Sequence, residues 1–146
     1  MGLPRWSVVG HDRGARVAYR MALDSPECIE RLVVLDIVPT LDMVEQCSYE
    51  LAGNLVNWFF LAQSAPLPER LIAAAGDFYI DDILDRWLGP SASLDSQARE
   101  AYLAAFRNPA VVHTVCEECR AGSTADIAHD REDREAHAGP RHHMPS

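Results

Sequence analysis

The feature that most constrains this chain is a turn framed by two glycines, Gly10-His11-Asp12-Arg13-Gly14. A short apolar run, Trp6 to Val9, precedes the turn, and a stretch rich in Ala, Arg and Met, Ala15 to Leu23, follows it. The first run predicts a buried parallel strand and the second predicts a helix. A strand that turns sharply into a helix projects the residue at the tip, here Asp12, off the end of the sheet.

The turn has the spacing of a nucleophile elbow, G-x-S-x-G, with aspartate in place of serine. The flanking glycines remove Cβ atoms that would clash in so tight a turn. The N-terminus of the following helix favours an anion at the tip. An aspartate carboxylate in that place is suited to attack an alkyl carbon and form a covalent ester. Because Gly-x-Asp-x-Gly also occurs in ordinary turns, these five residues leave a plain turn equally open.

The residues around the turn extend the pattern through most of the chain. Three segments, Gly10–Arg16, Arg20–Asp24 and Leu32–Thr40, resemble the haloacetate (fluoroacetate) dehalogenases of the α/β-hydrolase superfamily. Three later segments are similar to the cap of that family: Asn57–Leu61, Ala65–Ile72 and Arg120–Gly122. The resemblance extends from about Pro4 to about Glu135.

The resemblance and the hydrophobic pattern together predict an α/β fold in three parts. Residues 1–40 are expected to form a partial α/β-hydrolase core, with the order strand, nucleophile elbow, helix, strand. Residues 41–122 are expected to form an all-helical cap. Residues 123–146 are strongly charged and are expected to be a disordered or non-native tail. Within the cap, Asp77 and Asn108 are predicted to cap helices, and Pro109 follows Asn108 at a first helical position.

The resemblance implies a role for each candidate residue. Asp12 would displace halide from carbon, and a histidine-activated water would then hydrolyse the ester. Arg13 and Arg16 would hold the substrate carboxylate, because a guanidinium fork matches a carboxylate. Asp36 would be the acidic member of the triad, and Trp58 would contact the halide. The alternatives are a turn-forming aspartate, solvated arginines, a loop-capping aspartate and a core tryptophan.

Two positions depart from the defluorinating pattern, and the catalytic histidine is missing. Asn57 stands where the family carries histidine, and Cys119 stands where it carries a halide-binding tyrosine. Since a thiol donates only weakly, chloroacetate or bromoacetate is favoured over fluoroacetate as the substrate. His11 is expected to have a structural or site-wall role rather than to act as the base. No suitable context surrounds the later histidines: His129, His137, His142 and His143. The chain therefore looks like the middle of a hydrolase, and we expect it not to turn over.

Composition limits the partners. The net charge is −9 and the pI is near 5.0, which argues against nucleic acid or an anionic membrane surface as partner. No apolar run approaches the roughly 20 residues of a membrane span, and the N-terminus is not a signal peptide, so the cytoplasm is expected. A small acid is the expected partner. An open strand edge makes a homodimer one expected form, beside aggregation or a molten state.

No cofactor or metal is expected. Cys116 and Cys119 form a lone C-x-x-C, which lacks the second ligand pair that zinc requires. Two cysteines one turn apart on a cap helix are favoured instead. The expected function also has two alternatives. An epoxide hydrolase would need cap tyrosines, and Tyr49, Tyr79 and Tyr102 match no such pattern. A non-catalytic fragment or binding module is favoured by the missing histidine.

Overall fold

A computed structural model describes residues 5–137, which form two compact units. The first, here called the elbow unit, holds the described residues up to Ser48 together with those from Ala125 onward. The second, the helical unit, is Tyr49–Thr124. The predicted boundary at residue 40 therefore falls later along the chain, because the helix that follows residue 39 packs within the elbow unit. In the described part of the chain, no helix is both long and apolar enough to cross a membrane.

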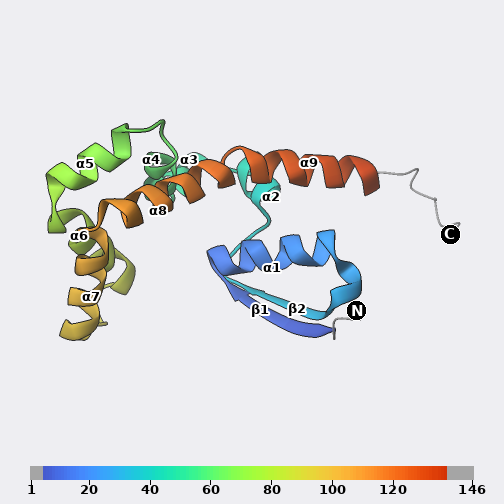
Figure 1. The fold of residues 1–146 in the computed structure, drawn as a ribbon, viewed down its shortest axis with the longest axis horizontal. Helices are drawn as coiled ribbons and strands as arrows, with labels where there is room; N and C mark the ends of the chain where they lie inside the picture. Colours follow the sequence, from blue (N-terminus) through green and yellow to red (C-terminus); the bar gives the residue numbers. More distant parts are fainter. Residues whose placement is uncertain (1–4, 138–146) are drawn as a thin grey trace, which may run out of the picture. The chain divides into compact units, whose positions relative to one another are not determined.

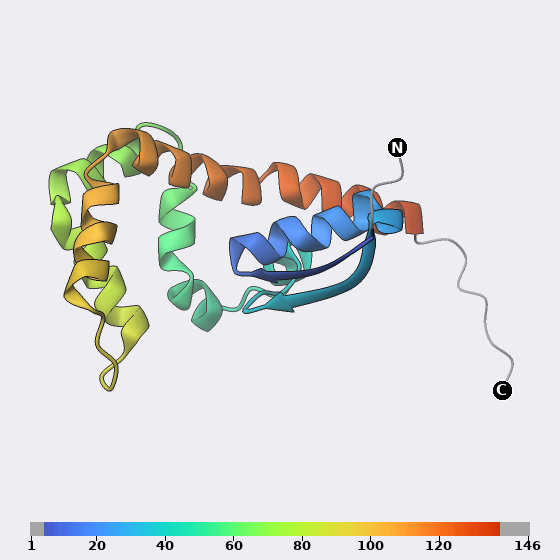
Figure 2. The same ribbon diagram turned by 60° about the horizontal axis from the view of Figure 1, so that its bottom comes forward.

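The elbow unit begins with the predicted strand–helix–strand order (Figure 1). Strand β1 is Trp6–His11, helix α1 is Arg13–Asp24, and strand β2 is Ile29–Leu35, preceded by a 3₁₀ turn, Pro26–Cys28. The strands are parallel, with Val9 opposite Val33. In both views α1 runs along one face of the strands (Figure 2), where the small side chains of Ala15 and Ala18 are buried. The α/β fold expected for the core is confirmed.

The strands are more exposed than their apolar sequences predicted. Val9 is 67% exposed, and the four apolar residues Leu32–Leu35 of β2 are all exposed as well. The expectation of a buried β1 is wrong for the described residues. Its physical reason is that α1 covers only one face and that the sheet in this part of the chain has two strands. Strands of parallel sheets are buried only when both faces are covered.

Two further helices complete the elbow unit. Helix α2 is Thr40–Glu45 and helix α9 is Ala125–His137, and the two pack together. Arg134 of α9 donates to carboxylates of Asp42 and Glu45 at 2.6 Å each. The expectation of a disordered tail from residue 123 is therefore wrong as far as His137. The helix attaches through charged side chains, which an apolar periodicity does not detect. The rest of the expected tail, residues 138–146, lies outside the described residues.

The helical unit contains no strand, as predicted for the region from Leu41 to Ala121. Its core is Ile72, Val112 and Cys116, against which aromatic side chains such as Phe60 and Phe106 pack. The helices are α3 (Tyr49–Asn54), α4 (Val56–Leu61), α5 (Leu67–Ala75), α6 (Asp77–Leu88), α7 (Ser96–Phe106) and α8 (Pro109–Gly122). Helix α8 packs against α4, α5 and α7, and α6 packs against α5 and α7.

One predicted cap is confirmed and one is wrong. The Asn108 side chain accepts a hydrogen bond from the Ala110 backbone N–H at 3.0 Å and so caps α8. Helix α6 instead has Gly76 at its N-cap, with φ of 62°. The Asp77 carboxylate accepts from Arg107 Nε at 2.9 Å, and this pairing lowers the pKa of Asp77. The carboxylate that the sequence predicted to cap α6 is thus engaged in an ion pair with Arg107, which directly follows α7.

Candidate active site

Asp12 occupies the sharp turn between β1 and α1. Its backbone has φ of 50° and ψ of −121°, which is strained for a residue with a side chain. Backbone hydrogen bonds stabilise this strained conformation of Asp12. The Asp12 N–H donates to the Leu35 carbonyl at 3.1 Å, and the Asp12 carbonyl accepts from the N–H groups of Ala15 and Arg16 at 3.0 and 3.2 Å. The predicted elbow geometry is therefore present, with an exposed carboxylate at its tip.

Gly10 is required by this geometry and Gly14 is not. A Cβ on Gly10 would lie 2.5 Å from the Ala15 Cα and 2.6 Å from the Gly14 carbonyl oxygen. A Cβ on Gly14 would meet nothing within 4 Å. The prediction that both flanking glycines relieve a clash is thus wrong for Gly14, where a Cβ would project into open space.

Asp36 follows β2 at the same end of the sheet. The parallel register sets His11 opposite Leu35, so the residues after each strand, Asp12 and Asp36, emerge side by side. Asp36 also has a positive φ, 59°. Its carboxylate lies near His11, whose Nε2 is 3.7 Å from Oδ2, and both side chains are mostly exposed. At that distance and exposure the contact is a weak electrostatic one. The pairing of His11 with Asp36 was not predicted, although the register could have indicated it.

Arg13 and Arg16 lie on the first turn of α1, and both are half-buried. The Arg16 guanidinium donates to the Thr40 hydroxyl through Nη1, and its Nη2 lies 3.6 Å from Met43 Sδ. This position does not match a fully solvated helix-surface arginine. The four candidate residues Asp12, Arg13, Arg16 and Asp36 therefore belong to one unit and cluster around the start of α1.

Asn57 and Trp58 belong to the helical unit, where both are half-buried on α4. The ring of Trp58 stacks on Phe59 with centroids 6.0 Å apart. Cys119 and Cys116 are buried on α8, one helical turn apart, and burial raises the pKa of the Cys116 thiol to about 11. Both cysteines of the C-x-x-C thus lie on the buried face of α8.

Three residues around Arg16 were missed by the sequence analysis. They are Tyr19 of α1, Thr40 of α2 and Asp130 of α9, and Tyr19 hydrogen-bonds both of the others. Tyr19 and Thr40 lie near the motif in sequence but have no motif of their own. Asp130 lies in a charged segment, where a buried acid cannot be told from its exposed neighbours by pattern.

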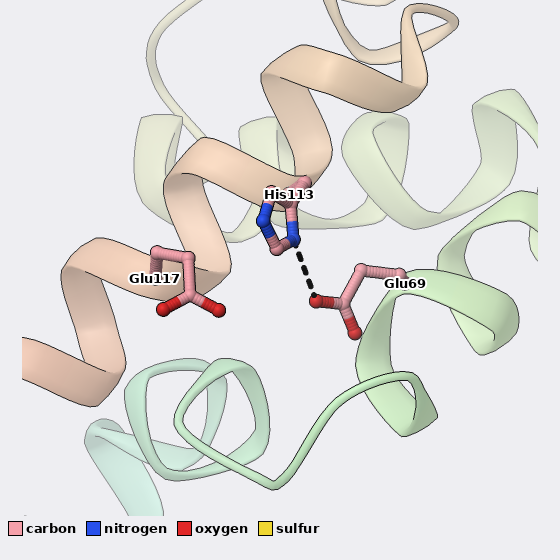
Figure 3. A group of neighbouring side chains, drawn as sticks. All are labelled: Glu69, His113 and Glu117. Carbon is pink, nitrogen blue, oxygen red and sulfur yellow. Dashed lines mark hydrogen bonds and ion pairs between the residues drawn. The ribbon is translucent and has the colours of Figure 1, made fainter.

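The helical unit holds one group of described residues with ligand atoms close enough to bind a metal: Glu69, His113 and Glu117 (Figure 3). Figure 3 shows His113 and Glu117 on one helix, with the His113 ring turned toward Glu69 at 3.3 Å. Arg120 already donates to Glu69 at 2.8 Å and to Glu117 at 2.5 Å. Burial opposes ionisation of Glu69, but hydrogen bonds from its own N–H, Arg120 and His113 lower its pKa. The group is an ion-pair network in which Arg120 supplies the cation.

Comparison with known proteins agrees with the resemblance seen in the sequence. No protein-family model matches the chain. The chain is 40% identical to a fluoroacetate dehalogenase from Burkholderia sp over 134 residues, which cover 91% of this chain and 44% of that protein. A solved α/β hydrolase of provisional assignment from Nostoc sp PCC 7120 superimposes with a TM-score of 0.82 at 42% identity, covering 92% of this chain and 46% of the other. The chain belongs to the α/β-hydrolase superfamily.

This α/β hydrolase is also similar to a solved protein from Pseudomonas aeruginosa that is provisionally assigned as an epoxide hydrolase. The identity is 44% and the TM-score 0.85, covering 92% of this chain and 45% of that one. The chain spans less than half the length of these relatives. The likeness to dehalogenases predicted from the elbow and cap segments is confirmed, and the partial core followed by helices matches the fold of the superfamily.

Proposed function

We propose that this chain carries the nucleophile and substrate-binding part of a haloacetate dehalogenase. The observation that carries the proposal is the strained Asp12 at the elbow tip, beside a glycine that cannot carry a Cβ. An Asp12 carboxylate oxygen would attack the carbon that bears the halogen. The new C–O bond forms as the carbon–halogen bond breaks, and halide leaves with the electron pair. The product of this step is an aspartyl ester.

Arg13 and Arg16 are proposed to bind the carboxylate of the substrate. Both side chains start from the first turn of α1, and the N–H of Arg16 is tied to the Asp12 carbonyl. Two guanidinium groups can each donate to a carboxylate and would align the substrate along the line of attack. The Arg13 backbone N–H, at the first position of α1, would also stabilise an oxyanion during ester hydrolysis.

Asp36 is proposed as the acidic partner of the catalytic base. Its place at the carboxyl end of the strand beside Asp12 supports this role. A base must reach a water near the ester, and no histidine in residues 5–137 makes contacts that suit this role, His11 included. We therefore propose that this chain alone performs displacement at most once, and that hydrolysis of the ester needs groups from elsewhere.

The preferred substrate is proposed to be chloroacetate or bromoacetate. Trp58 and Asn57 would contact the halide, and Cys119 replaces a stronger donor. Fluoride needs stronger hydrogen-bond donors than chloride or bromide, and a thiol is a weak one. No nucleic-acid partner is proposed because the net charge is −9, and the cytoplasm remains the expected compartment.

Epoxide hydrolysis is the second candidate, because one similar solved structure is assigned that activity. In the helical unit, the buried hydroxyl of Tyr79 has no hydrogen-bond partner, and burial raises its pKa to about 12. An epoxide hydrolase needs a neutral phenol to protonate the epoxide oxygen, but this hydroxyl is buried within the helical unit. The two arginines on α1 favour an acid substrate instead.

The experiment on the whole activity uses a chimera. Residues 5–137 would replace the corresponding segment of the fluoroacetate dehalogenase relative, and halide release would be compared with epoxide opening. We expect release of chloride and bromide that is lost in Asp12→Ala. Epoxide opening that depends on Asp12, without halide release, would favour the second candidate.

The experiment on this chain itself uses bromoacetate after its thiols have been blocked. Intact-mass and peptide analysis should find one carboxymethyl group at Asp12, absent in Asp12→Ala, and no more than one bromide per chain. Blocking is done on the folded chain, where Cys28 and Cys47 are partly exposed. Cys116 is fully buried and its pKa is about 11, so its thiol stays protonated and unreactive. Sustained bromide release would show that the chain contains a base and would contradict the single-event proposal.

A further inference from the structure

Asp130 is a buried carboxylate in a helix whose other acids are more exposed. It is 8% exposed, and its oxygens accept hydrogen bonds from the Tyr19 hydroxyl at 2.9 and 3.1 Å. The backbone N–H of Leu41 donates to the same carboxylate at 3.1 Å, and an Arg20 nitrogen lies 3.7 Å away. Burying a carboxylate is costly unless its oxygens are satisfied. The contacts reach α1 and the start of α2, so Asp130 joins three helices of the elbow unit.

A chain of hydrogen bonds leads from Asp130 to Arg16. The Tyr19 oxygen lies 3.1 Å from Thr40 Oγ1, and Thr40 is fully buried. The same Thr40 oxygen accepts a hydrogen bond from Nη1 of Arg16. A guanidinium can only donate, a carboxylate can only accept, and each hydroxyl has one proton. These limits fix the direction of every hydrogen bond in this series. Arg16 donates to Thr40, Thr40 donates to Tyr19, and Tyr19 donates to Asp130.

We propose that Asp130 is a positioning residue for Arg16. It fixes the orientation of both hydroxyls and, through the Leu41 N–H, the start of α2, which also supplies Met43 beside the guanidinium. The consequence for substrate binding rests on the proposed function, in which Arg16 binds a small carboxylate. Asp130 is connected to Arg16 through Tyr19 and Thr40, and it does not touch the reacting atoms.

Asp133 provides a matched control on the same helix. It pairs with Arg20, and its side chain forms no hydrogen bond with the described residues Tyr19, Thr40 and Leu41. Asp130→Ala and Asp133→Ala remove the same charge and the same acceptor group from α9, but only the first interrupts the hydrogen-bond chain. Tyr19→Phe interrupts it while leaving the bond between Asp130 and the Leu41 N–H, and so serves as a second variant if Asp130→Ala fails to fold.

The first measurement is the rate at which phenylglyoxal modifies Arg16, followed by peptide mass analysis. Arg86, exposed in the helical unit, is the internal reference. We expect modification of Arg16 to be about tenfold faster in Asp130→Ala and Tyr19→Phe, because the Thr40 hydroxyl that accepts from Arg16 is then no longer held in place. Asp133→Ala should match the unaltered chain. Equal rates at Arg16 in all four proteins would overturn the proposal.

The second measurement compares two alkylating reagents at Asp12, bromoacetate and its neutral analogue bromoacetamide, in thiol-blocked protein. In each case an Asp12 oxygen bonds to the methylene carbon and bromide leaves. Asp130→Ala should lower the preference for bromoacetate about tenfold, as Arg16→Ala does, without slowing bromoacetamide. Equal slowing of both reagents would mean a merely structural role and would overturn the proposal. If the unaltered chain shows no preference, the substrate role of Arg16 is wrong, and the phenylglyoxal rates still decide whether Asp130 positions it.

Discussion

Replacement of Gly10 by alanine should break the elbow. An added Cβ would meet three backbone atoms at 2.5 to 2.7 Å: the Ala15 Cα, the Gly14 carbonyl oxygen and the Ala15 nitrogen. Ordinary van der Waals contact with carbon begins near 3.4 Å. Because all three atoms are backbone, no side chain can turn away, and α1 must move by several tenths of an ångström from the end of β1.

The cost can be set at about 2–3 kcal/mol, the upper part of the range for overpacking, since backbone atoms cannot relax by a change of rotamer. Such a loss would raise the population of the locally opened elbow by about 30- to 150-fold. The assay is amide hydrogen exchange with peptide mass analysis over β1 and α1. Peptides from the helical unit serve as an internal reference. Protection of the N–H groups of Asp12, Ala15 and Arg16, which form the turn hydrogen bonds, reports the opening directly.

Gly14→Ala is the matched control. Nothing lies within 4 Å of the added Cβ, and Gly14 is a helical residue of α1. Alanine is a better helix former than glycine, so this change should stabilise α1 by up to about 0.5–1 kcal/mol and slow exchange there about two- to fivefold. Exchange in Gly10→Ala as slow as in the unaltered chain would refute the close approach of α1 to β1, and with it the elbow geometry.

Three other predictions concern the site, the helical unit and association. In the chimera, Arg16→Ala should lower kcat/KM for haloacetate mainly by raising KM, by about 2–3 kcal/mol for a lost charge-assisted contact, and an unchanged kcat/KM would remove Arg16 from the site. The pKa of Asp77 is lowered by Arg107 from 3.8, so the pair stabilises the folded helical unit above that value and loses its effect as pH falls through the lower folded pKa. Thermal melts between pH 5 and pH 2 should therefore depend less on pH in Asp77→Asn, and equal slopes in the two proteins would contradict the ion pair. Because both strands expose apolar side chains, the chain by itself should self-associate in light scattering or sedimentation, whereas a monomer with a sharp two-state melt would disagree.

Much of the helical unit could be predicted from local sequence. Asn108 followed by Pro109 marks the start of α8, and Gly89, with φ of 69°, lies just past the end of α6, where glycine is common. Such signals are local because a cap is formed by a residue and the backbone of its own helix. The Asp77 cap failed because Arg107, thirty positions along the chain, competes for the same carboxylate.

The sequence by itself determined the elbow: the strand, the glycine at position 10, the acid at position 12 and the helix behind it follow from short-range spacing and steric limits. Only the tertiary structure decided which residues surround it. The parallel register brings Asp36 beside Asp12. The packing of α9 places Asp130 against Tyr19, which is connected through Thr40 to Arg16. The physical reason is that hydrogen bonds between residues more than a hundred positions apart leave no periodicity in the sequence. A buried aspartate and an exposed one look alike until the chain has folded.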